Sequence, residues 1–123
     1  MKFFKNKTEK NLQKNDFPDH ILILDKKSFN DFIQSYPICL IDFWAPWCKP
    51  CRTMGPRMRR LSSIYKDKLA FGKINIQQNK EIAEKYKIMS IPTFILFISG
   101  KQKTSIYGVK SVGEIKKIIE KYV

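Results

Sequence analysis

Residues 38–51 read ICLIDFWAPWCKPC, and this stretch decides the fold of the chain. Its first part, residues 38–44, is a nearly continuous apolar run, typical of a central strand that is buried on both faces. Two cysteines, Cys48 and Cys51, follow where this run gives way to a helical pattern of apolar side chains over residues 54–65. The stretch therefore predicts a buried strand that leads through a cysteine pair into a helix.

The position of the two cysteines favours redox chemistry. A helix N-terminus carries partial positive charge and unpaired N–H groups, which stabilise a thiolate relative to a thiol. We expect Cys48 to stand at the mouth of the helix as the more exposed sulfur, with Cys51 one turn inside and close enough to bond it. Taken alone, such a pair indicates either a redox site or half of a metal site.

Strands and helices alternate along the rest of the chain. Further strands are expected at 21–24, 69–75, 94–98 and 103–107, and further helices around 29–33, at 79–86 and at 111–122. Asp25 or Ser28 is expected to cap the first helix, and Ser99-Gly100-Lys101 to form a hairpin turn. The resulting order, β-α-β-α-β-α-β-β-α, predicts an α/β protein with a mixed central sheet and helices on both faces.

The composition is that of one globular domain. The chain has 123 residues, of which 43% are hydrophobic and 13% aromatic, enough to build a core. Residues 1–19 are polar and rich in Lys and Asn, and we expect a mobile basic tail there, followed by a domain over residues 20–123. We see no apolar run of the roughly 20 residues that a membrane span needs, and no export signal. We therefore expect a cytoplasmic protein in a reducing compartment.

The net charge of +13 is high for a domain of this size. Such a charge attracts acidic partners, nucleic acid or anionic membranes, but a lysine-rich solvated surface is the simpler interpretation. Arg52, Arg57, Arg59 and Arg60 gather on the helix after the cysteines. A solvated helix face explains them, and electrostatic docking of an acidic protein beside the sulfurs is the alternative. No readout motif predicts specific nucleic-acid binding.

The segment Trp-Ala-Pro-Trp-Cys-Lys-Pro-Cys-Arg, preceded by Ile41-Asp42-Phe43, resembles the active-site signature of the thioredoxin family. The resemblance extends over residues 21–123 and includes family-like positions at Pro56, Lys73, Ser90-Ile91-Pro92-Thr93 and Gly108. It implies a thioredoxin-like, three-layer α/β/α fold and a thiol–disulfide oxidoreductase. Pro56 lies inside the predicted helix and is expected to kink it.

The resemblance also implies roles for four residues near the reacting sulfurs. Cys48 would be the attacking thiolate and Cys51 the resolving cysteine, so that a substrate disulfide is reduced and a Cys48–Cys51 disulfide remains. Asp42 would lie under the site, with a pKa raised by burial, and act as general base toward Cys51. Lys73 would lie near Asp42 and modulate the action of its carboxyl as a base.

A substrate-binding surface follows from the same resemblance. Pro92 would be a cis-proline facing the cysteines, and Ile91 would present backbone groups to an extended substrate segment. An apolar rim would surround the sulfurs. The expected substrate-binding residues are Trp47, Lys49, Pro50, Met89, Ile91, Pro92 and Gly108.

Lys49 departs from the family pattern, in which glycine is usual at this position. An ammonium beside Cys48 favours the thiolate and so stabilises the reduced form. We therefore expect a redox potential at or modestly above the roughly −270 mV of thioredoxin, and below that of protein disulfide isomerase. Pro50, which accompanies reducing members of the family, is retained.

The expected function is a protein-disulfide reductase, or dithiol electron carrier. Its partners would be proteins with reducible disulfides and a thioredoxin-reductase-like donor, typically a flavoprotein; the chain would be a monomer without an organic cofactor. Alternatives are a thiol oxidase or disulfide isomerase and, from another class, a basic binding or chaperone module. A zinc site is disfavoured because only Cys39 and His20 remain as ligands, and Cys39 suits core packing.

Overall fold

A mixed sheet forms the centre of the computed structural model, which describes residues 17–123. Within those residues five strands are arranged in the order β1-β3-β2-β4-β5. The elements along the chain are β1 (Leu22–Leu24), α1 (Phe29–Ser35), β2 (Ile38–Trp44), α2 (Lys49–Ile64), β3 (Ala70–Asn75), α3 (Lys80–Lys85), β4 (Thr93–Ile98), β5 (Lys101–Tyr107) and α4 (Val112–Ile119). The predicted α/β class and element order are confirmed.

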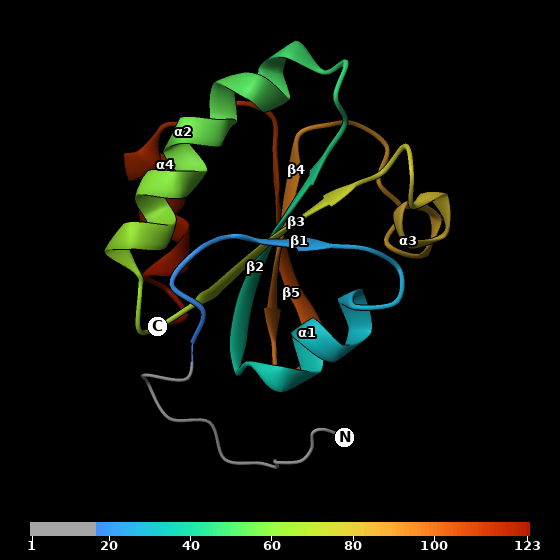
Figure 1. The fold of residues 1–123 in the computed structure, drawn as a ribbon. Coiled ribbons are helices and arrows are strands. Elements are labelled where there is room, and N and C mark those ends of the chain that lie inside the picture. Colours follow the sequence, from blue (N-terminus) through green and yellow to red (C-terminus); the bar gives the residue numbers. More distant parts are fainter. Residues whose placement is uncertain (1–16) are drawn as a thin grey trace.

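Strand β2 lies at the centre of the sheet, as its apolar sequence predicts. It pairs in parallel with β3 and antiparallel with β4, so both of its edges are hydrogen-bonded. Helices α2 and α4 cover one face of the sheet, and α1 and α3 cover the other (Figure 1). The strand therefore has no solvent-facing side over most of its length, which is why a run of apolar residues suits it.

Each face of the sheet has its own apolar core. On the α2/α4 face, Met54, Met58 and Leu61 of α2 pack with Ile115 and Ile119 of α4. The opposite core contains an aromatic group in which Phe29, Phe43, Tyr86 and Phe97 lie with ring centroids 5.2–6.3 Å apart. The two cores fix the helices on the sheet and so hold α2 in place behind the cysteines.

The cap of α1 differs in part from the prediction. Ser28 stands at the N-cap position but its side chain makes no cap hydrogen bond. Asp25 instead accepts hydrogen bonds from the backbone N–H groups of Lys27 and Ser28, each at 2.9 Å. The carboxylate thus stabilises the turn that leads into α1, rather than the first turn of the helix itself.

The hairpin between β4 and β5 is tighter than predicted. Ser99 and Gly100 both have positive φ angles, 52° and 78°, as a two-residue turn with a matching twist requires. Ile98 and Lys101 are therefore already paired, and Lys101 begins β5 instead of belonging to the turn. The predicted strand at 103–107 was two residues short because the turn needs only two residues.

Other boundaries follow the predictions closely. Pro56 lies inside α2, and Figure 1 shows this helix curving along its length.

Phe17 stacks on Tyr36 with ring centroids 5.8 Å apart, so contacts with the folded part begin before His20. The expected division between residues 19 and 20 remains a prediction, and residues 1–16 of the expected tail lie outside the described residues. Within the described part, no helix has the length and apolar character needed to cross a membrane.

Helix α4 begins with a capping box, which gives a direct test of how the α2/α4 layer is stabilised. Ser111 Oγ accepts from the Glu114 N–H at 3.1 Å, and Glu114 Oε1 accepts from the Ser111 N–H at 2.8 Å. We predict that Ser111→Ala lowers the free energy of unfolding by about 1 kcal/mol, because an orphaned helix N–H loses its acceptor. Urea denaturation measures this loss. Ser111→Asp retains an acceptor and should restore most of the stability; equal losses in both variants would contradict the capping role.

Candidate active site

The cysteine pair lies where β2 passes into α2. Cys48 is the N-cap residue of α2, and its Sγ accepts a hydrogen bond from the Cys51 backbone N–H at 3.2 Å. The two cysteines form a disulfide, with their Cα atoms 5.3 Å apart. The predicted placement of Cys48 at the helix mouth, with Cys51 one turn inside and bonded to it, is confirmed. Positive partial charge from the helix N-terminus therefore acts directly on the Cys48 sulfur.

Exposure of the two cysteines corrects one expectation. Cys48 is 4% exposed and Cys51 is 6% exposed, so Cys48 is not the more accessible residue. Both cluster with buried Ala45, and Trp44, Ile76 and Ile91 pack against the cluster. The disulfide is therefore covered by its own loop and by the segment before Pro92.

The segment 90–93 packs against the cysteine cluster through Ile91. The Ile91–Pro92 peptide bond is cis, as predicted. Thr93 Oγ1 donates to the Ser90 carbonyl at 2.7 Å and closes the turn, while the Gly108 N–H donates to the Pro92 carbonyl at 2.9 Å. Gly108 has a φ of 82°, a conformation that favours glycine. The structure thus joins Ile91, Pro92 and Gly108 into one rim beside the sulfurs.

The other expected substrate-binding residues are solvent-facing. Trp47 is 66% exposed and Met89 is 92% exposed, unusual values for large apolar side chains. Lys49 and Pro50 are also exposed, in the first turn of α2. Aromatic side chains and Met are enriched in protein–protein interfaces, so Trp47 and Met89 offer contact area to a partner.

Asp42 lies in β2, beneath the cysteine loop, and is only 6% exposed. It lines a cavity of about 570 Å³ together with Lys73, its register partner on β3. Burial raises the pKa of Asp42 to about 7, and the positive charge of Lys73 opposes that rise. Among the described residues, no donor reaches Asp42 Oδ1. A buried carboxyl with this pKa changes its protonation state near neutral pH.

Lys73 influences the pKa of Asp42 through its charge, without a direct ion pair. The salt bridges within residues 17–123 are Lys26–Glu81 and Asp19–His20, so Lys73 and Asp42 are not a direct ion pair. Instead the Lys73 Nζ lies 4.6 Å from the centroid of the Trp44 ring, a cation–π contact. Trp44 therefore holds the ammonium near Asp42, a role that the sequence did not indicate, because there the residue is only the end of a predicted buried strand.

Ile76 is a second neighbour of the sulfurs that sequence reasoning missed. Its N–H donates to the Trp44 carbonyl at 2.9 Å, which continues the β2–β3 ladder beyond Asn75 and brings the side chain to the cysteine cluster. The signal available in the sequence was its position directly after a predicted parallel strand. Parallel neighbours end at the same edge of a sheet.

The residues considered for a zinc site do not come together. Cys39 is buried in β2, where its thiol contacts the carbonyls of Phe32 and Tyr36. His20 is exposed and pairs with Asp19 at 2.9 Å. Within the described part of the chain, no group of three His, Cys, Asp or Glu residues could hold a metal ion.

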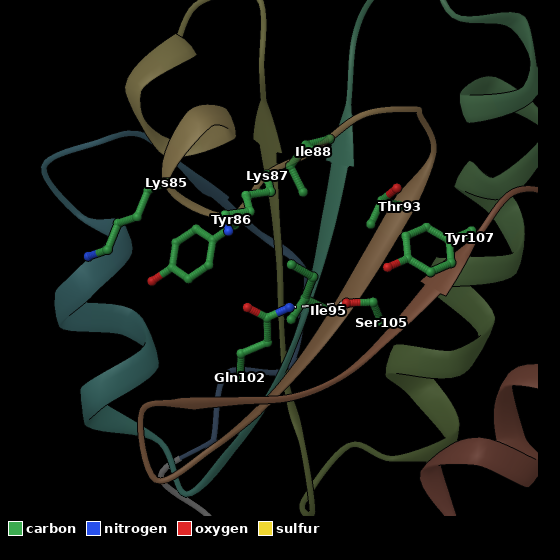
Figure 2. Close-up of a pocket in the computed structure, with 9 residues that line it drawn as sticks. All are labelled: Lys85, Tyr86, Lys87, Ile88, Thr93, Ile95, Gln102, Ser105 and Tyr107. Atoms are coloured by element: carbon green, nitrogen blue, oxygen red, sulfur yellow. Dashed lines mark hydrogen bonds between the residues drawn. The ribbon is translucent and has the colours of Figure 1, made fainter.

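A separate hollow of about 360 Å³ lies on the α1/α3 side of the sheet, between residues 85–88 and the β4–β5 hairpin. Figure 2 shows Thr93 and Tyr107 at one end of it and Tyr86 and Lys85 at the other. Neither cysteine nor Asp42 lines this hollow, so it is distinct from the disulfide site.

Comparisons with known proteins agree with this geometry. The family model described as thioredoxin matches residues 20–121. The chain belongs to the thioredoxin family. Such proteins are thiol–disulfide oxidoreductases, and the Cys48–Cys51 disulfide of this chain is the group that this chemistry needs.

Individual relatives support the same assignment. The chain is 42% identical over 86 residues to a thioredoxin of Griffithsia pacifica, an alignment that covers 70% of this chain and 79% of the relative. It is 39% identical over 94 residues to a chloroplastic M-type thioredoxin of Chlamydomonas reinhardtii, covering 76% and 67%. Among solved structures, a mutant thioredoxin of Halobacterium salinarum superposes with a TM-score of 0.80 at 30% identity, covering 86% of this chain and 93% of that one. The Plasmodium falciparum thioredoxin gives 0.78 at 29%, covering 84% and 100%.

The raised pKa of Asp42 predicts a pH-dependent cost to stability. The folded chain holds this proton up to about pH 7, whereas an unperturbed aspartate loses it near pH 3.8, so wild-type stability falls as pH rises between these values. Asp42→Asn has no such carboxyl and should gain ~3–4 kcal/mol over wild type between pH 4 and pH 8. Denaturant unfolding of the oxidised proteins at both pH values measures this change.

Asp25→Asn is a control of opposite sign. Hydrogen bonds from the backbone and side chain of Ser28 lower the pKa of Asp25 below 3.8, so this variant should lose stability relative to wild type as pH rises toward 4 and change little between pH 4 and pH 8. A stability difference for Asp42→Asn that is the same at pH 4 and pH 8 would show that Asp42 is not protonated in the folded chain near neutral pH.

Proposed function

We propose that this chain is a protein-disulfide reductase that transfers electrons from Cys48 and Cys51 to disulfides of partner proteins. The observation that carries the proposal is the cysteine pair at the N-terminus of α2, packed against the segment that holds cis-Pro92. A helix N-terminus stabilises the thiolate that must attack, and the adjacent rim offers a surface to the protein under attack.

The proposed reaction proceeds in two exchanges and begins with both cysteines reduced. The Cys48 thiolate attacks one sulfur of the substrate disulfide, forms a mixed disulfide and releases the other substrate sulfur as a thiolate. The Cys51 thiolate then attacks the Cys48 sulfur, which releases the second substrate sulfur. Two electrons have passed to the substrate, and the Cys48–Cys51 disulfide remains. The hydrogen bond from the Cys51 N–H to Cys48 Sγ supports the assignment of Cys48 as the activated thiolate.

Asp42 is proposed as the general base that takes the proton of Cys51 before the second exchange. Its pKa of about 7 suits proton transfer at neutral pH. The cavity beside it, about 570 Å³, has room for water at the carboxyl, and such a water is proposed to pass on the proton of the thiol. Lys73 is proposed to keep this pKa from rising further, since its charge favours the carboxylate.

The proposed substrate-binding surface consists of Trp47, Lys49, Pro50, Met89, Ile91, Pro92 and Gly108. An extended substrate segment would lie along the backbone of Ile91, beside the sulfurs, as an added strand does. The redox equivalents reside in the two sulfurs, so no bound organic cofactor is proposed. A dithiol donor of the thioredoxin-reductase type, typically a flavoprotein, would return the pair to its reduced form.

Two alternative functions compete with the reductase. A thiol oxidase or isomerase would use the same sulfurs in the opposite direction or for rearrangement, and retention of Pro50 favours the reductase. A binding module would depend on the basic surface, and a double Cys→Ser variant would retain its biological role. The cytoplasmic location stays a prediction; the Chlamydomonas relative is named as chloroplastic.

The two cysteines have different proposed roles, which single substitutions separate. In insulin reduction driven by dithiothreitol, we predict that Cys48→Ser loses essentially all catalysis, because no nucleophile remains. Cys51→Ser should also lose turnover but should accumulate the mixed disulfide, because the resolving thiol is absent. Non-reducing electrophoresis detects this adduct, and full activity of Cys48→Ser would overturn the mechanism. Capture of adducts from a cell lysate on immobilised Cys51→Ser would then identify substrates.

The position of Lys49 predicts the redox potential. Equilibration with glutathione or dithiothreitol buffers should give a value at or modestly above roughly −270 mV, because the ammonium stabilises the reduced thiolate form. Lys49→Gly removes that charge and should lower the potential by about 10–30 mV. The variant Lys49→Arg keeps the charge and should stay near the wild-type value. A wild-type potential well below that of thioredoxin would contradict the effect assigned to the Lys49 ammonium.

A further inference from the structure

Helix α2 carries a strong excess of positive charge next to the disulfide. Residues 49–64 contain five basic side chains and no acidic one: Lys49, Arg52, Arg57, Arg59 and Arg60. All of them except Arg57 are exposed. At 3.6 residues per turn, the four exposed cations fall on the side of α2 opposite to Cys51, Met54, Met58 and Leu61, which are buried. We call Lys49, Arg52, Arg59 and Arg60 the α2 basic stripe; it runs about 16 Å along the helix from the residue after Cys48.

The positive charge of this region is not neutralised within the fold. Neither of the two salt bridges within residues 17–123 involves a side chain of α2. The carboxylate of Glu114 feels one α2 cation: its pKa is lowered mainly by hydrogen bonds with Ser111, and further by the charges of Lys110 and Arg57. That carboxylate is already held by the Ser111 N–H. It therefore does not cover the α2 basic stripe.

Three cationic side chains are also fixed at the border of the site. Arg52 Nη1 donates to the Pro46 carbonyl at 2.9 Å, within the loop that leads to Cys48. Arg57 Nη1 donates to the Lys110 carbonyl at 2.9 Å, and Lys110 Nζ donates to the Tyr107 carbonyl at 2.8 Å. These bonds direct positive charge at the two loops that flank the disulfide. Side chains already held by the fold lose less conformational entropy when a partner binds.

We infer that the α2 basic stripe is a docking surface for proteins whose disulfide lies beside a cluster of Asp and Glu side chains. The inference rests on the proposed function, because it names the kind of protein disulfide that the site reduces fastest. The stripe raises the rate of encounter with an acidic surface and orients it so that the substrate sulfur meets Cys48.

An acidic protein fits the stripe better than a nucleic acid does. The stripe begins at the residue next to Cys48, so an occupant of the stripe brings its own surface to the disulfide, and nucleic acids contain no disulfide to reduce. Residues 49–64 also include no aromatic side chain on which bases could stack, and the exposed Trp47 before them supplies one ring where a strand of bases needs several.

Two synthetic peptides test the inference. Each contains the same intramolecular disulfide, flanked by three Glu residues in one peptide and by three Lys residues in the other. We expect the wild-type chain to reduce the acidic peptide with a kcat/KM about tenfold higher at low ionic strength. The ratio should approach one at about 0.5 M NaCl, where charges are screened within a few ångströms.

A charge-matched pair of variants separates the stripe from the overall charge. The triple variant Arg52→Gln, Arg59→Gln and Arg60→Gln should bring the acidic-to-basic ratio close to one at low salt. The control, Lys80→Gln, Lys101→Gln and Lys103→Gln, removes the same charge from α3 and β5 and should retain most of the preference. Equal loss in both variants would assign the effect to net charge and overturn the inference.

The other outcomes are equally distinct. Equal rates for both peptides with the wild-type chain would overturn the docking surface and leave the reductase function intact. The ratio of kcat/KM for the two peptides could be near one while a single-stranded 20-mer oligonucleotide binds in 0.15 M salt in an arginine-dependent way. This result would identify nucleic acid, and not an acidic protein, as the partner that binds the α2 basic stripe. Failure to reduce either peptide would instead count against the proposed function.

Discussion

The pairing of β2 on both of its edges is the constraint on which the site depends. Its ladder with β3 sets Asp42 opposite Lys73, and its ladder with β4 sets Phe43 opposite Thr93, the residue after cis-Pro92. Because β2 ends directly before the cysteine loop, these ladders also set where the sulfurs lie. A shift of one residue in either ladder would turn Asp42 to the other face of the sheet.

The same burial that stabilises β2 gives Asp42 its chemistry. A carboxyl placed among apolar strands holds its proton to higher pH, and Lys73 moderates this effect from the neighbouring strand. The ammonium is in turn held over the Trp44 ring, so a residue of the core contributes to the electrostatics of the site. The stability that the chain gives up to bury Asp42 is thus linked to the proton transfer proposed for it.

Much of the fold could be predicted because its signals are local. The apolar run of β2, the helical spacing of α2 and the alternation of elements were sufficient for the class and the order of elements. The details that differed depend on backbone geometry: Ser99 adopts a positive φ, which lets Lys101 join β5, and the Asp25 carboxylate accepts from the turn before α1 while Ser28 makes no cap hydrogen bond to the helix. Spacing alone does not distinguish such turns, because several residues nearby have suitable side chains.

By itself, the sequence of this protein determined the redox pair, its place at a helix N-terminus and the excess of positive charge along that helix. These follow from residue order, since three residues of helix bring Cys48 and Cys51 together. Only the tertiary structure decided that Ile91 and Ile76 cover the sulfurs and that Lys73 lies over Trp44. It also decided that Arg57 reaches Lys110, a residue far away in sequence. The physical reason is the same in each case: these contacts join segments that only the sheet and its covering helices bring side by side.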